Sequence, residues 1–116
     1  MAGVLSPEKI WKEGGGSGAS GRIPQDAEFF QDHFPCFPVL PGVVALDLLK
    51  QTAEYGGGKK LVAILRVKFS SYLKPGDEWE SRAERVATGR KNEVEYAAKL
   101  LHAGKAAVTA RLIFES

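Results

Sequence analysis

Hydrophobic residues in the second half of the chain recur at every other position, the period of β-strands with one face in a core. This alternation is found in four runs, at residues 61–69, 79–86, 94–100 and 106–114. Turn-forming residues separate the runs at 74–77, 89–92 and 103–105. The pattern predicts that the C-terminal half is an antiparallel meander of four strands.

One stretch has the period of a helix instead. A helix is predicted from residue 43 to about residue 55, because residues of one helix face recur at Ala45, Leu48, Leu49, Thr52 and Ala53. The first turns are apolar nearly all round, which indicates burial on most sides. Three glycines at 56–58 end the helix.

The residues before this helix are less regular. Residues 4–13 are predicted to form an edge strand, and the following GGGSGASG at 14–21 matches the GxGxxG pattern of dinucleotide-binding loops. Such a loop needs a buried strand before it and a helix N-terminus behind it, whereas Pro24 follows closely here. We therefore interpret residues 14–21 as a flexible hairpin connection without a nucleotide.

These elements predict an α+β domain in which a curved antiparallel sheet grips one helix. The chain of 116 residues is long enough for one hydrophobic core and too short for two. We expect a single domain over residues 1–116.

Composition excludes several classes of function. The 16 basic and 14 acidic residues are interspersed, so no broad cationic face for nucleic acid is expected. One cysteine and two histidines form no metal-ligand spacing, and no apolar run approaches a membrane span. We expect a cytoplasmic protein without a structural metal, and His102 is expected to be a solvated surface residue.

The main candidate catalytic residues lie in the segment DHFPCFPVLPGVVALD, residues 32–47. Its three prolines fix φ and extend the residues before them, so His33 is held on a rigid segment. Histidine is the usual general base near neutral pH, and a carboxyl group is its acid partner where the surroundings keep that group protonated. Asp47, among apolar neighbours on the predicted helix, is the candidate acid.

Gly42 adds a third element at the start of the helix. Backbone N–H groups there have no intrahelical acceptor, and a glycine lets a ligand approach closely. The Gly42 N–H is therefore a candidate donor to an oxyanion.

The motif resembles that of a known family. His33-Phe34-Pro35, then residues 38–43 (PVLPGV), Asp47 and Gln51 are similar to the signature of the hotdog-fold β-hydroxyacyl-(acyl carrier protein) dehydratases. The likeness extends over most of the chain from about Arg22. It implies the hotdog fold, a curved antiparallel sheet wrapped around one long central helix.

The resemblance also implies a reaction. His33 would remove the α-proton of a 3-hydroxyacyl thioester and Asp47 would assist loss of the 3-hydroxyl as water, giving a trans-2-enoyl thioester in fatty-acid or related polyene synthesis. No cofactor is implied. Further substrate contacts fall on Phe34, Pro41 and Val43, with Gln51 supporting the acid.

The resemblance implies a homodimer in which His33 of one subunit faces Asp47 of the other beside an apolar tunnel. The substrate would be carried by an acidic acyl carrier protein or by coenzyme A, and candidate docking charges are Arg66, Lys68, Arg82, Arg85 and Arg90. Two alternatives stay open at this stage, a hotdog acyl thioesterase and a non-catalytic module that binds acyl thioesters. Chain length, carrier, isomerase activity and pathway also stay open.

Overall fold

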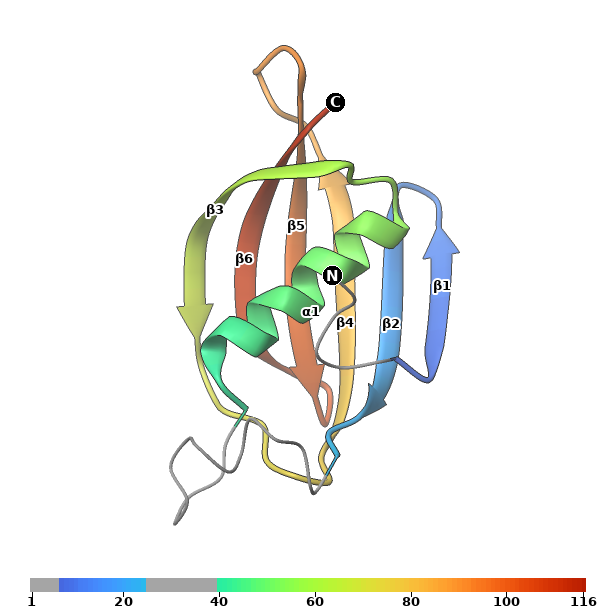
Figure 1. The fold of residues 1–116 in the computed structure, drawn as a ribbon, viewed down its shortest axis with the longest axis vertical. Coiled ribbons are helices and arrows are strands. Elements are labelled where there is room, and N and C mark those ends of the chain that lie inside the picture. The colour runs from blue at the N-terminus through green and yellow to red at the C-terminus, as the bar shows by residue number, and fades with distance from the viewer. Residues whose placement is uncertain (1–6, 25–39) are drawn as a thin grey trace.

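The computed structural model describes residues 7–24 and 40–116, which form one sheet and one helix (Figure 1). The strands are β1 (Lys9–Glu13), β2 (Gly16–Arg22), β3 (Lys60–Phe69), β4 (Glu78–Val86), β5 (Glu93–His102) and β6 (Lys105–Glu115). The helix is α1 (Gly42–Tyr55). The strands pair antiparallel in the order β1-β2-β4-β5-β6-β3, and the sheet curves around α1 as predicted.

One part of the predicted topology is wrong. Strands β4, β5 and β6 form a meander, but β3 pairs with β6 and not with β4. The chain leaves α1, passes over one end of the sheet and runs down beside β6 (Figure 1). Alternation indicates which residues face a core, but it carries no information about which strand lies alongside.

The helix packs on the sheet through one face. Its buried residues are Val44, Ala45, Leu48, Leu49, Thr52 and Ala53, and they meet β2, β4 and β5. From the sheet, Leu100 and Leu112 are fully buried and Tyr96 meets Phe114 edge-to-face with ring centroids 5.6 Å apart. The first turns are largely buried, as predicted: Val44 and Ala45 are buried and Leu46 packs against the core, whereas Val43 is 76% exposed.

Buried hydroxyl groups fix the position of α1 on the sheet. Ser17 of β2 donates a hydrogen bond to the Thr52 carbonyl at 2.5 Å, and the Thr52 hydroxyl bonds to the Leu48 carbonyl and to the hydroxyl of Ser81 in β4. These bonds satisfy polar groups that would be costly to bury unpaired. They also tie the helix to two neighbouring strands.

The glycine-rich segment is a strand and not a flexible connection, so that prediction is also wrong. Gly14 and Gly15 make the turn after β1, and Gly16 to Arg22 form β2 between β1 and β4. A Cβ atom at Gly18 would lie 2.3 Å from the Trp11 ring, and one at Gly21 would lie 3.0 Å from the Trp79 ring. The glycines therefore allow two indole rings to pack against the strand.

Candidate active site

The N-terminus of α1 presents backbone donors. Pro41 is the N-cap in an extended conformation, and its carbonyl accepts hydrogen bonds from Val44 N at 3.0 Å and Ala45 N at 3.1 Å. Within the described residues, the N–H groups of Gly42 and Val43 meet no acceptor. Unpaired donors at the positive end of a helix dipole favour an oxygen that carries negative charge.

The surroundings of these donors are apolar. A Cβ atom at Gly42 would lie 3.0 Å from the Phe69 ring, so glycine allows this close packing. A small pocket beside Gly42 is lined mainly by hydrophobic residues, among them Leu40, Phe69, Leu73, Leu100 and Val108. Val43, the next residue along the helix, is 76% exposed.

Asp47 lies on the helix face opposite the buried one, and its side chain is half-buried. Gln51, one turn further, donates from Nε2 to Asp47 Oδ2 at 2.8 Å. Tyr55, one more turn along, donates from its hydroxyl to Gln51 Oε1 at 3.4 Å. The amide of Gln51 is thus oriented from both ends, and it fixes one oxygen of Asp47.

Of the three hydrogen-bonded residues Asp47, Gln51 and Tyr55, only Tyr55 was not predicted from the sequence. Its place four residues after Gln51 and eight after Asp47 was the available signal, because such residues share one helix face. His33 and Phe34 lie outside the described residues, so their relation to Asp47 stays a prediction. Pro41, Gly42, Val43, Asp47 and Gln51 do come together on the first three turns of α1.

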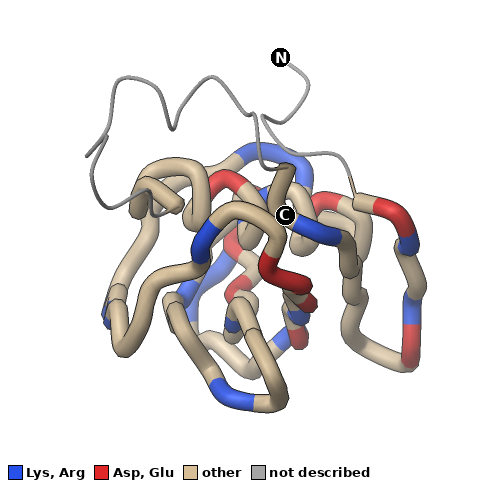
Figure 2. Tube along the Cα trace, turned by 90° about the horizontal axis from the view of Figure 1, so that it is seen from below, with Lys and Arg blue, Asp and Glu red and all other residues tan. Residues whose placement is uncertain are grey.

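The predicted docking charges do not form a uniform cationic surface. Arg66 and Arg82 line a shallow groove of about 360 Å³ with Lys99 and Arg111, on the sheet face away from α1. Arg82 is paired with Glu80 at 2.6 Å, and this hydrogen bond raises the pKa of Arg82. Figure 2 shows acidic and basic residues interspersed along the chain.

Two further features concern metals and membranes. In residues 7–24 and 40–116, no three His, Cys, Asp or Glu side chains gather as a metal site. Within the same residues, the structure has no helix with the length and apolar character to span a membrane.

Sequence comparison links the chain to dehydratases. Residues 13–110 match the ApeI-like family, whose description is ApeI dehydratase. The 3-hydroxyacyl-[acyl-carrier-protein] dehydratase FabZ of Lactiplantibacillus plantarum is 36% identical over 95 residues, 74% of this chain and 64% of that protein. FabZ of Oceanobacillus iheyensis is 38% identical over 65 residues, 48% of this chain and 46% of that protein. The chain spans about half the length of several such relatives.

Solved structures share the architecture. The dehydratase heterocomplex ApeI:P from Xenorhabdus doucetiae aligns with a TM-score of 0.73 at 20% identity, over 96% of this chain and 100% of that one. The R-hydratase PhaJ1 from Pseudomonas aeruginosa aligns with a TM-score of 0.68 at 17% identity, over 90% of this chain and 82% of that one. At these identities the likeness establishes the fold, and the predicted hotdog fold is confirmed.

Proposed function

Because the chain belongs to the ApeI-like dehydratase family, we propose that it is a 3-hydroxyacyl-thioester dehydratase that forms trans-2-enoyl thioesters. The observation that carries the proposal is the arrangement of α1. Its N-terminus offers the Gly42 and Val43 N–H groups without an acceptor among the described residues, and one turn later Asp47 is held by Gln51. This combination suits a reaction that develops an enolate oxygen and expels a hydroxyl group.

The proposed chemistry needs one base and one acid. His33 takes the α-proton, and the electron pair of that C–H bond moves toward the thioester carbonyl, whose oxygen gains negative charge. The Gly42 N–H stabilises this oxygen. The C3–oxygen bond then breaks, the carboxyl of Asp47 gives its proton to the departing hydroxyl, and water and the trans-2-enoyl thioester result.

We propose acyl carrier protein as the carrier of the substrate, with coenzyme A as the alternative. The names of the FabZ relatives support this choice, since they specify a 3-hydroxyacyl-[acyl-carrier-protein] substrate. Pro41, Val43 and Phe34 would contact the acyl thioester near Gly42. Proton transfer between side chains and substrate completes the reaction, so the proposal includes no cofactor.

The proposed active form is a homodimer joined through β3. This strand is the outermost of the sheet beyond β6, and it exposes four apolar side chains, Val62, Leu65, Val67 and Phe69, by 39–50%. An open apolar edge favours pairing with another strand. Pairing with β3 of a second copy would cover these residues. The resemblance to the dehydratases implies that His33 of one subunit then faces Asp47 of the partner subunit beside an apolar tunnel.

The experiment uses the purified chain and 3-hydroxyacyl carrier proteins of several acyl lengths, with enoyl absorbance as the signal. We expect turnover by the wild type and a fall in kcat of roughly 100- to 10,000-fold for His33→Ala and for Asp47→Asn, the range that general acid–base groups contribute. Lys50→Ala is the matched control, because Lys50 is on the same helix with its charge directed to Glu54 at 3.9 Å. It should retain wild-type kcat.

Two results would contradict the proposal. Release of free thiol from a crotonyl thioester, without hydration of its double bond, would assign the chain to the thioesterases. Binding of acyl thioester with no turnover of any acyl length would assign it to the non-catalytic modules.

A further inference from the structure

Both ends of the segment that carries His33 are attached to one turn of the chain. At the first end, Ile23 N donates to the Asp77 carbonyl at 2.8 Å, and Gly76 N donates to the Ile23 carbonyl at 2.8 Å. At the second end, Leu40 N donates to the Leu73 carbonyl at 2.7 Å. We call residues 73–78 the brace, because they join the two points between which residues 24–39 run.

The brace is itself a well-defined turn. The Asp77 N–H donates to the Lys74 carbonyl at 3.0 Å, and the Asp77 carboxylate accepts from the Lys74 N–H at 2.8 Å. Gly76 has φ +86°, which suits the third position of a type II turn that follows Pro75. Leu73 is 1% exposed, so the turn is anchored in the core at its start.

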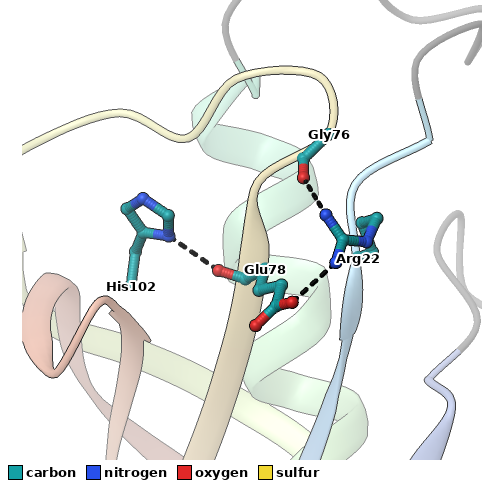
Figure 3. A network of polar contacts seen from close by, with 4 residues as sticks. All are labelled: Arg22, Gly76, Glu78 and His102. Carbon is teal, nitrogen blue, oxygen red and sulfur yellow. Dashed lines mark hydrogen bonds and ion pairs between the residues drawn. The ribbon is translucent and has the colours of Figure 1, made fainter.

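Two side chains hold the brace from opposite sides (Figure 3). From β2, Arg22 donates one guanidinium N–H to the Gly76 carbonyl at 2.8 Å and another to Glu78 Oε1 at 2.6 Å. From the end of β5, His102 Nδ1 lies 2.7 Å from the Glu78 carbonyl, and its Nε2 lies 3.7 Å from Asp77 Oδ2. His102 is 38% exposed, so it is the surface residue that the sequence predicted, and it also contacts the brace.

We propose that Arg22 is a positioning residue for His33 and acts through the brace, an inference that rests on the proposed role of His33 as base. The guanidinium fixes the carbonyl of Gly76, whose own N–H holds Ile23 where the segment begins. A general base must lie within hydrogen-bond reach of the proton it removes. A displacement of about 1 Å can lower a rate roughly 100-fold.

The ion pair between Arg22 and Glu78 is exposed, so an effect of Arg22 on activity can be separated from an effect on stability. The side chains of Arg22 and Glu78 are 58% and 75% exposed. Surface ion pairs stabilise proteins little, so loss of the pair should hardly change the melting temperature. A positioning role predicts that activity changes while stability does not.

The test compares Arg22→Met with Arg111→Met. Arg111 is a matched control because it also forms an ion pair, with Glu95 at 3.1 Å, and is 38% exposed, but its partner lies outside the brace. We expect Arg22→Met to lower kcat roughly 10- to 100-fold with unchanged KM, while both variants melt within about 4 °C of the wild type. Arg22→Lys, which keeps one donor group, should recover part of kcat.

Hydrogen–deuterium exchange of peptides from residues 24–40 gives a second readout that does not need activity. We expect faster exchange in Arg22→Met than in the wild type or Arg111→Met. Equal exchange in all three, or faster exchange with unchanged kcat, overturns the inference. If the wild type has no turnover but exchange rises in Arg22→Met alone, the proposed function fails and the anchoring by Arg22 is supported.

Discussion

Gln51 shows how one residue can set the geometry of another. Its amide accepts from Tyr55 at one end and donates to Asp47 at the other, so the side chain has little freedom to rotate. A carboxyl group held in this way presents its second oxygen in a defined direction. In the proposed reaction, Gln51 would therefore act by orienting the carboxyl group of Asp47.

Replacement of Gln51 by leucine should therefore lower kcat about 3- to 10-fold, which corresponds to the roughly 1 kcal/mol net value of one hydrogen bond. Steady-state kinetics on the same acyl substrates provide the measurement. Tyr55→Phe removes the more distant of the two bonds and should have a smaller effect. A Gln51→Leu enzyme with full kcat would show that Asp47 needs no such support.

For single residues, the sequence predicts a contact where residue type and spacing along a helix determine it. Asp47 and Gln51 are four apart on a helix, so their contact follows from the period of the helix. The network around His102 could not be predicted, because it joins Glu78 to a residue 24 positions away in the chain. Such contacts depend on strand pairing, which local pattern does not encode.

Among the secondary-structure elements, β2 departs most from its expected character. Its sequence GSGASGR has few strand-forming residues, and propensity alone would place it in a loop. The strand exists because β1 and β4 pair with it on both sides and because Trp11 and Trp79 occupy the space that side chains would take. Tertiary packing thus overrides local preference here.

Gly16→Ala tests this interpretation of β2. A Cβ at Gly16 would lie 2.9 Å from the Ala83 carbonyl oxygen, which is backbone and cannot swing away. We expect a loss of about 1–3 kcal/mol in the free energy of unfolding, measured with urea. Gly15→Ala is the control, since nothing lies within 4 Å of a Cβ there, and it should be nearly neutral. Equal stability of the two variants would mean that β2 accommodates side chains.

Strands β3 to β6 and the helix were predicted within about two residues, because strong periodicity marks them, whereas β1 was predicted from residue 4 and begins at Lys9. The placement of β3 beside β6 was not predicted, and neither was the exposure of Val43. An apolar residue such as Val43 is equally compatible with a core and with a surface that a partner covers. The sequence pattern indicates that such a residue avoids water, but it does not indicate which part of the protein or which partner covers it.

For the molecule as a whole, Val67→Lys tests the proposed dimer. A lysine at this position places a charge in the apolar edge and should weaken association by about 2 kcal/mol, roughly 30-fold in the dissociation constant. Size-exclusion chromatography with light scattering, over a range of concentrations, measures the change. Activity should fall in parallel as subunits separate, if His33 and Asp47 of different subunits cooperate.

Ile10→Lys is the matched control for Val67→Lys. Ile10 is also apolar and 51% exposed, but it lies on β1 at the other border of the sheet. This variant should retain the assembly of the wild type. A wild type that stays monomeric at all concentrations and is fully active would contradict the proposed dimer.

The two borders of the sheet differ in their capacity to add further strands. Strand β1 has only five residues, KIWKE, and its lysines and glutamate discourage further strand addition, whereas β3 has ten residues and is largely apolar. The proposed self-pairing through β3 is a symmetric contact that would cover the apolar border of both copies. In the proposed dimer, strand addition would therefore stop at two chains, because the border that joins the subunits would no longer be free to start a filament.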